Sequence, residues 1–141
     1  PSNEEHLFFN LSVDGGSNYN VSKTSTVFQS YNAENDSGRA LSYQSGNDLA
    51  NGTGDQKIAN NIAINNDSSF NGEMFLFNPS STTFVKHFIL RAPYHEGSNG
   101  IVEYFVAGYG NTTSAVDAII FRMDIGNIDS GTIKLYGIKD S

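Results

Sequence analysis

Five carboxylates could supply acid–base chemistry, but no sequence spacing couples any two of them. They are Glu73, Glu96, Glu103, Asp117 and Asp124. Glycoside hydrolysis needs two carboxylates roughly 5–9 Å apart across a cleft, whereas Glu73 and Glu103 fall in the middle of expected strands. No G-x-S-x-G nucleophile motif occurs. The sequence therefore predicts a protein that is not an enzyme, with a glycosidase as an alternative.

The chain also lacks the residue spacing of a metal site. Its three histidines form no H-x-H or H-x-x-x-H pattern, and the absence of cysteine excludes thiolate ligands and disulfides. Calcium is the metal that the chain would suit best, because Asp14, Asp124 and Asp129 stand in loops rich in Gly and Asn. None of these loops matches the EF-hand pattern. We expect no metal and no cofactor, with calcium as the alternative.

The stretch SVDGGSNYN, residues 12–20, has the chemistry of a tight turn. The carboxylate of Asp14 can accept backbone N–H groups, and the ring of Tyr19 can pack beneath it. Gly15 and Gly16 can take the positive φ that such a turn requires. The pattern resembles the Asp-box of sialidases, which carry several copies and place their catalytic groups elsewhere, whereas this chain has one. We predict a structural hairpin turn that closes the first two strands, with sugar contact as the alternative.

Tyrosines near the expected turns are the candidate binding residues. Tyr31, Tyr43, Tyr94, Tyr104 and Tyr109 lie at or near turns. Tyrosine stacks on sugar rings or anchors protein interfaces, because it presents a large area at a small cost in conformational entropy. We take four of them as candidates for binding, namely Tyr31, Tyr43, Tyr94 and Tyr109. The alternative is that these rings pack within the sheet.

The composition narrows the class of partner. The net charge of −7 argues against nucleic acid and anionic membrane surfaces, because both attract clusters of Lys and Arg. Charged residues make up 16% of the chain, below the roughly 25% of an average domain. No apolar run approaches the roughly 20 residues that would insert across a bilayer. A surface built of amides and hydroxyls suits neutral partners, either glycans or proteins.

Alternation of apolar side chains with a period of two recurs along the chain and indicates β-strands. We expect strands over residues 6–13, 19–31, 70–77, 83–91, 101–109, 115–123 and 132–138, with a short one near 40–44. Residues 57–64 fit either a helical turn or an irregular strand, and residues 94–100 read as a turn. Apolar residues on both faces of 83–91 predict that both of its sides are covered. Residues 32–56 form a long polar segment that fits either a recognition loop or a contact arm.

These elements predict one domain over residues 1–141. Seven or eight strands joined by turns and long loops rich in Gly and Asn indicate an all-β fold. We expect an antiparallel β-sandwich of the jelly-roll kind.

Three segments carry a resemblance to a known group of proteins. They are FLFNPSSTTFVKHF (75–88), VAGYGNTTSAVDAIIFRMDIGNIDSGTIKLYGIK (106–139) and LFFNLSVDGGSNYN (7–20). Together they resemble virion structural domains of tailed bacteriophages, especially marine and environmental phages. Such domains belong to fibre, appendage or head-decorating proteins, and the resemblance carries over no catalytic residue. The related domains have one or two further strands at the start. Either this fold is a shorter variant, or an upstream segment or another chain supplies them and leaves the strand 6–13 with an unpaired edge.

The residues and the resemblance together favour a non-enzymatic virion protein, displayed on the particle as a fibre, spike or capsid-decoration module. The expected partners are copies of the chain itself, as a trimer or higher, or other virion proteins. A glycan on the host surface is a further expected partner, because the module would also mediate attachment. The alternative is a carbohydrate-binding module of a phage or bacterial depolymerase.

Overall fold

A computed structural model describes residues 5–138 of the chain, and every regular element in that range is a β-strand. The strands are β1 (Glu5–Ser12), β2 (Lys23–Ala33), β3 (Arg39–Tyr43), β4 (Gln56–Ile62), β5 (Glu73–Leu76), β6 (Lys86–Glu96), β7 (Gly100–Gly110) and β8 (Ala118–Met123). Residues 5–138 accordingly contain no helix with the length and apolar character that a bilayer crossing requires.

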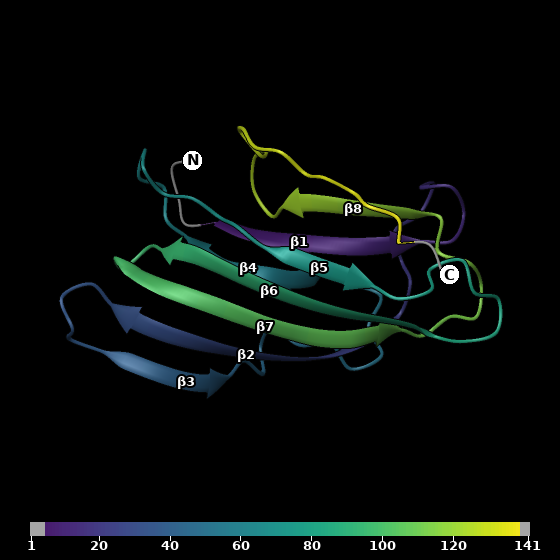
Figure 1. Cartoon of the computed structure of the whole chain (residues 1–141), viewed down its shortest axis with the longest axis horizontal. Helices are drawn as coiled ribbons and strands as arrows, with labels where there is room; N and C mark the ends of the chain where they lie inside the picture. The colour runs from purple at the N-terminus through teal and green to yellow at the C-terminus, as the bar shows by residue number, and fades with distance from the viewer. Residues whose placement is uncertain (1–4, 139–141) are drawn as a thin grey trace.

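The eight strands form one antiparallel sheet, with β3 and β8 at its two ends (Figure 1), and this sheet folds into two layers that pack face to face through their buried side chains. One layer has the order β3-β2-β7-β6-β5 and the other has the order β4-β1-β8. The layers join at one corner, where Ile62 of β4 pairs with Glu96 of β6. The prediction of an all-β antiparallel sandwich with seven or eight strands is confirmed. The jelly-roll connectivity and the role of the long Gly/Asn-rich loops stay predictions.

The core lies between the layers and explains the alternation in the sequence. On β1, Leu7, Phe9 and Leu11 point inward and are buried. The facing layer contributes alternate residues of β6 and β7, which are Phe88, Leu90, Ala92, Tyr94, Val102, Tyr104 and Val106. The rings of Phe9 and Phe88 meet edge to face with their centroids 5.1 Å apart. Burial of this apolar surface is the main favourable contribution to folding.

The predicted hairpin between the first two strands is wrong. The β1 strand pairs with β4 on one side and with β8 on the other, where the pairs run from Leu7↔Met123 to Ser12↔Ala118. Both edges of β1 are therefore occupied, which also contradicts an unpaired edge on this strand. The turn after β1 instead carries the chain into the opposite layer, where β2 pairs with β3 and β7.

Other elements differ from expectation at their boundaries. Of residues 57–64, those up to Ile62 belong to a strand, β4, and the segment 32–56 is interrupted by β3 as expected. The β6 strand continues through residues 94–96, so the expected turn over 94–100 is confined to the residues between β6 and β7. The expected strand over 70–77 is reduced to β5, and the strand expected over 132–138 does not form. That last segment has the alternation of a strand, but no neighbouring strand in residues 5–138 pairs with it.

Candidate functional site

The turn that begins at Ser12 is built around the carboxylate of Asp14. Oδ1 of Asp14 accepts hydrogen bonds from the Ser12 hydroxyl at 2.7 Å and from the backbone N–H of Asn18 at 2.9 Å. The side-chain amide of Asn18 donates to Oδ2 at 2.7 Å. These bonds favour the charged form, with those from Asn18 the largest cause, and lower the pKa of Asp14 to about 2. The carboxylate thus holds the turn together.

The rest of the predicted turn residues also serve local structure. Gly15 and Gly16 have φ of 71° and 82°, as predicted. A Cβ on Gly16 would lie 2.9 Å from the hydroxyl oxygen of Tyr19, so the ring covers this glycine closely. The backbone N–H of Gly15 donates to Asp117, which ties the turn to the start of β8. The prediction of Asp-box turn chemistry therefore describes the geometry, while contact with sugar stays untested.

The structure separates the four candidate tyrosines. Tyr94 is 2% exposed and lies in the core, so the expectation that it is an exposed ring is wrong, and the same holds for Tyr104. Tyr94 follows Phe88, Leu90 and Ala92 in the inward alternation of β6, which places its ring inside. Its hydroxyl donates to the carbonyl of Asn60 at 2.8 Å and accepts from the Asn60 N–H at 3.0 Å.

Desolvation sets the acidity of the two buried tyrosines. Burial raises the pKa of Tyr94 well above its usual value and raises that of Tyr104 to about 12. The hydroxyl of Tyr104 accepts a hydrogen bond from the Asn47 side chain at 2.8 Å. Both hydroxyls therefore stay protonated and bonded within the fold at neutral pH.

A shallow cleft at one end of the sandwich brings two of the candidates together. It is lined by Tyr31 and Tyr94 together with polar side chains, among them Gln29, Asn60, Glu96 and Ser98. Tyr31 is half-buried on the inner face of β2, and its hydroxyl lies 3.5 Å from that of Ser98. Tyr94 contributes only the buried side of its ring. Of the pair, Tyr31 is the one that a ligand in this cleft could touch.

The other two candidates, Tyr43 and Tyr109, lie on the face of the β3-β2-β7-β6-β5 layer that points away from β1, which we call the outer face. Cross-strand pairing places one row of side chains across all five strands, in the order Tyr43, Phe28, Phe105, Arg91 and Glu73. Within this row Phe28 and Phe105 stack with their centroids 4.6 Å apart and their planes 7° apart. The guanidinium of Arg91 lies over the Phe105 ring at 5.3 Å.

The outer face is open to solvent and rich in large apolar side chains. Those exposed on it include Phe28, Leu41, Tyr43, Phe75, Ile89 and Ile101. The apolar residues on both faces of β6 predicted that both sides of this strand are covered, but Ile89 is 47% exposed. The expectation is wrong for the single chain, since no element within residues 5–138 packs over the outer face. Exposed apolar patches of this kind mark surfaces that bind a partner.

The carboxylates do not form a hydrolytic pair on this face. Glu73 and Glu103 flank Arg91, and Nε of Arg91 donates to Oε1 of Glu103 at 2.9 Å. The Arg91 guanidinium forms an ion pair with Glu103 and stands opposite Glu73 in the ladder, so it occupies the space that a substrate would need between the two carboxylates. Within residues 5–138 no three side chains of His, Asp or Glu are grouped to hold a metal ion, so the alternative of calcium lacks a preformed ligand set there.

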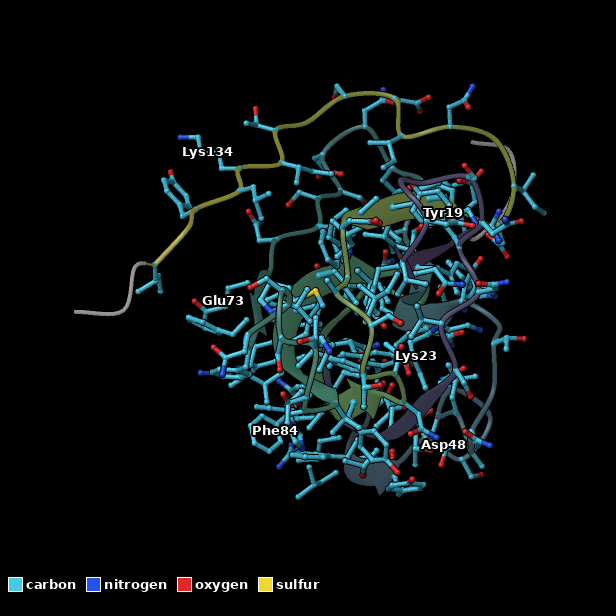
Figure 2. All side chains as sticks on the ribbon, turned by 90° about the vertical axis from the view of Figure 1, so that its right-hand side faces the viewer. Tyr19, Lys23, Asp48, Glu73, Phe84 and Lys134 are labelled. Carbon is cyan, nitrogen blue, oxygen red and sulfur yellow. The ribbon has the colours of Figure 1, made fainter. Side chains whose placement is uncertain are left out.

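The most exposed apolar segment is the C-terminal arm, by which we mean residues 124–138. In the view of Figure 1 it reverses direction after β8 and runs back toward the other end of the sandwich, and in Figure 2 Lys134 lies far from the body of the molecule. Leu135 is 89% exposed and Ile138 is 85% exposed, and Ile133 and Tyr136 also face solvent. Within the described chain no backbone hydrogen bond joins residues 127–138 to the sandwich.

Comparison with known proteins finds no relative of this chain. No family model, no curated protein and no solved structure matches the chain. The resemblance to phage virion domains therefore stays an expectation from the sequence motifs. The residues and contacts described above are the basis for any functional assignment.

One polar cluster in the interior had no signal in the sequence. Lys23 of β2 and Asn10 of β1 are both buried, and Nζ of Lys23 donates to Oδ1 of Asn10 at 2.5 Å. The amide nitrogen of Asn10 donates to Asp55, which also accepts from Arg122. The sequence does not predict this contact, because the lysine begins one strand and the asparagine lies in the middle of another, and only the fold brings them together.

Proposed function

We propose that this chain is a non-enzymatic structural module of a bacteriophage virion, displayed as a fibre, spike or capsid decoration, that works by associating with copies of itself. The observation that carries the proposal is the C-terminal arm, whose alternating apolar side chains are exposed and whose backbone makes no backbone hydrogen bond to the described sandwich over residues 127–138. The sequence motifs that resemble phage virion domains support the assignment to a virion.

The arm has the properties of a strand that lacks its neighbour. Its apolar residues alternate as in a half-buried strand, and its N–H and C=O groups are available for a ladder. Such a segment adds readily to an exposed sheet edge of another chain. The sandwich offers three edges of this kind, since β3, β5 and β8 each pair with one strand only in the described chain. Reciprocal use of arms and edges produces symmetric oligomers, and we expect a trimer or higher.

Sedimentation equilibrium of the full chain and of Leu135→Asp tests this role. Burying one Leu contributes roughly 1.5–3 kcal/mol, so we expect the substitution to weaken association at least about tenfold. Ile101→Asp is the matched control, because Ile101 is also exposed but lies on the outer face of β7, which pairs with a strand on each side. A chain that stays monomeric at high concentration, or an oligomer that tolerates Leu135→Asp and dissociates with Ile101→Asp, would contradict assembly through the arm.

The outer face favours a second activity, attachment to a glycan on the host surface. Tyr43 and the stacked rings of Phe28 and Phe105 form an open aromatic row, and flat aromatic surfaces of this kind bind sugar rings. The same row would serve a carbohydrate-binding module of a depolymerase. Glycan-array binding that is lost in Tyr43→Ala and kept in Leu41→Ala, which changes an aliphatic neighbour, supports attachment through this row. Binding that survives Tyr43→Ala excludes it.

The virion assignment has an independent test outside the protein. The genes that flank the reading frame should encode portal, capsid or tail components. Flanking genes for metabolic enzymes alone would contradict the assignment to a virion and leave the assembly role to be judged by sedimentation.

A further inference from the structure

A lysine and an asparagine lie in contact inside the sandwich, one from each layer. Lys23 begins β2, and Asn10 lies in β1 of the facing layer. Both side chains are buried, and Figure 2 places Lys23 within the body of the molecule. Nζ of Lys23 is 2.5 Å from Oδ1 of Asn10, and Oδ1 is bonded directly to Cγ, the amide carbon.

The sheet pairing explains why the Asn10 amide points here. The β4 strand begins at Gln56, which pairs with Phe9, so β1 has no ladder partner on that side beyond Phe9. Residues 53–55 pass β1 at this point without pairing with it, and the side chain of Asn10 occupies the place of the missing ladder partner. Nδ2 of Asn10 donates to the carbonyl of Thr53 at 3.2 Å and to Oδ1 of Asp55 at 2.9 Å.

The surroundings of Nζ suit a neutral amine, which is the nucleophilic form of lysine. Within the described chain Nζ has two hydrogen-bond acceptors, Oδ1 of Asn10 and the carbonyl of Val21 at 2.8 Å. Two acceptors match the two hydrogens of a neutral amine and leave one hydrogen of an ammonium group without a partner. Desolvation lowers the pKa of Lys23 to about 8, against the opposing charge of Asp55. Roughly one amine in ten is then neutral at pH 7.

The amide carbonyl of Asn10 is polarised for attack. Its oxygen accepts a hydrogen bond from the backbone N–H of Leu11 at 2.8 Å, in addition to the bond from Lys23. A fixed backbone donor at a carbonyl oxygen stabilises the negative charge that develops there when a nucleophile adds to the carbon. The Leu11 N–H is buried with the rest of β1, so water does not compete for this position.

Hydrogen bonds hold the amide nitrogen of Asn10, which would depart as ammonia. Three oxygens accept from it, namely the carbonyls of Tyr19 and Thr53 and Oδ1 of Asp55. An amide nitrogen has two hydrogens, whereas the ammonia that departs has three, so the three acceptors match the leaving group. Asp55 also positions this leaving nitrogen through Oδ1, and its negative charge acts on Nζ and stabilises the positive charge that Nζ acquires when it adds to the carbon. Nε of Arg122 fixes its second oxygen at 2.5 Å.

We propose that Lys23 and Asn10 join through an intramolecular isopeptide bond that ties the two layers of the sandwich together. The neutral Nζ attacks Cγ of Asn10, the Nζ–Cγ bond forms, and the Cγ–Nδ2 bond breaks. One proton moves from Nζ to Nδ2 within the tetrahedral adduct, in which Asp55 holds Nδ2, and ammonia leaves. The amine and the primary amide thus become a secondary amide plus ammonia, with no change in oxidation state.

Lys86 shows what an ordinary buried lysine looks like in the same fold. It is as fully buried as Lys23, and both residues pair with Gly110 of β7. Nζ of Lys86 donates to the backbone carbonyls of Phe84 at 2.7 Å and Thr112 at 3.2 Å. Backbone carbonyls offer no leaving group of this kind, so Lys86 is the matched control.

Mass spectrometry of the purified, denatured full chain tests the proposal. We expect a mass lower than that of the sequence by one ammonia molecule. Trypsin should fail to cut after Lys23 and release residues 1–39 as one peptide with the same deficit. Cleavage of that peptide before Asp14 should open the loop between residues 10 and 23 and leave the two pieces joined. A full sequence mass with normal cleavage after Lys23 would overturn the proposal without any variant.

Variants assign the deficit to the two residues. Lys23→Met should restore the full mass, whereas Lys86→Met should keep the deficit. Asp55→Asn should slow or abolish the loss of ammonia, and a deficit that forms at the normal rate in this variant would refute the role of Asp55. Asparagines before glycine, as at Asn51, Asn71 and Asn99, can also lose ammonia by cyclising on the backbone. A deficit that persists in Lys23→Met would have that origin and would overturn the isopeptide bond.

Discussion

The packing of the two layers can be tested at Phe9 and Phe88, whose rings meet between β1 and β6. The centroids are 5.1 Å apart, the planes are 84° apart, and both side chains are buried. An edge-to-face pair contributes about 0.5–1.5 kcal/mol beyond the area that it buries. We therefore expect Phe9→Leu and Phe88→Leu to be coupled by about 1 kcal/mol in the free energy of unfolding.

The size of the single effects follows from burial. Replacing a buried Phe by Ala costs roughly 3–5 kcal/mol, and Leu keeps much of the volume, so each single change should cost about 1–2 kcal/mol. The double variant loses the contact between the two rings only once. Its loss should therefore be about 1 kcal/mol smaller than the sum of the two single losses.

Urea unfolding of the four proteins, followed by circular dichroism, measures this coupling. A shared m-value allows the free energies to be compared through the shifts in midpoint, because m reflects the surface exposed on unfolding. Phe9→Leu combined with Phe105→Leu is the control, since Phe105 lies on the outer face, and this pair should be additive within about 0.5 kcal/mol. Additivity of Phe9 and Phe88 as well would show that the rings do not touch and would refute the layer packing.

Three further substitutions test individual contacts. Gly108→Ala should destabilise the fold by about 1–3 kcal/mol, because its Cβ would lie 2.5 Å from the carbonyl oxygen of Thr24, while Gly54→Ala, with open space around it, should be neutral in thermal melts. Tyr94→Phe should lose about 1–3 kcal/mol in urea unfolding, since it leaves the backbone groups of Asn60 unpaired; an unchanged midpoint would mean that the hydroxyl is not bonded. For Asp14 the folded pKa of about 2 lies below the usual value of 3.8 for an aspartate. The carboxylate therefore stabilises the fold above pH 3.8, and this contribution disappears as the pH falls to about 2. The difference in Tm between the wild type and Asp14→Asn should follow that course, and a difference that is constant from pH 5 to pH 2 would show that the charge does not stabilise the turn.

The sequence predicts those features that short-range physics decides. Alternating side chains locate β1, β7 and β8 within a few residues, because one buried and one solvated face impose a period of two. The Asp14 turn was likewise predictable, since its hydrogen bonds join residues no more than four apart. The inward position of Tyr94 was also readable, because it keeps the parity of Phe88 and Leu90. The prediction of a turn over residues 94–100 placed Tyr94 outside the strand, so this alternation was not applied to it.

Long-range competition decides the rest. The turn at Asp14 fits a hairpin, but β4 and β8 occupy both edges of β1 and the chain must cross to the other layer. The alternation in residues 132–138 predicts a strand, yet a strand also requires a neighbour, which the sequence does not name. The contact between Lys23 and Asn10 depends on the first of these long-range outcomes, because it exists only when β1 and β2 lie in different layers.

The pairing of β1 with β8 determines how the domain responds to force. Leu7, near the start of β1, pairs with Met123, the last residue of β8, so the upstream chain and the C-terminal arm leave from the same pole. Tension between those two points opens the ladder at this pair and breaks its hydrogen bonds one after another, because antiparallel strands pulled from one end peel apart. A bond between Lys23 and Asn10 joins β1 to β2 and not to β8, so it leaves this weak direction unchanged. A particle in which the domain bears mechanical load must therefore apply the force across the two layers, and not between the start of β1 and the C-terminal arm.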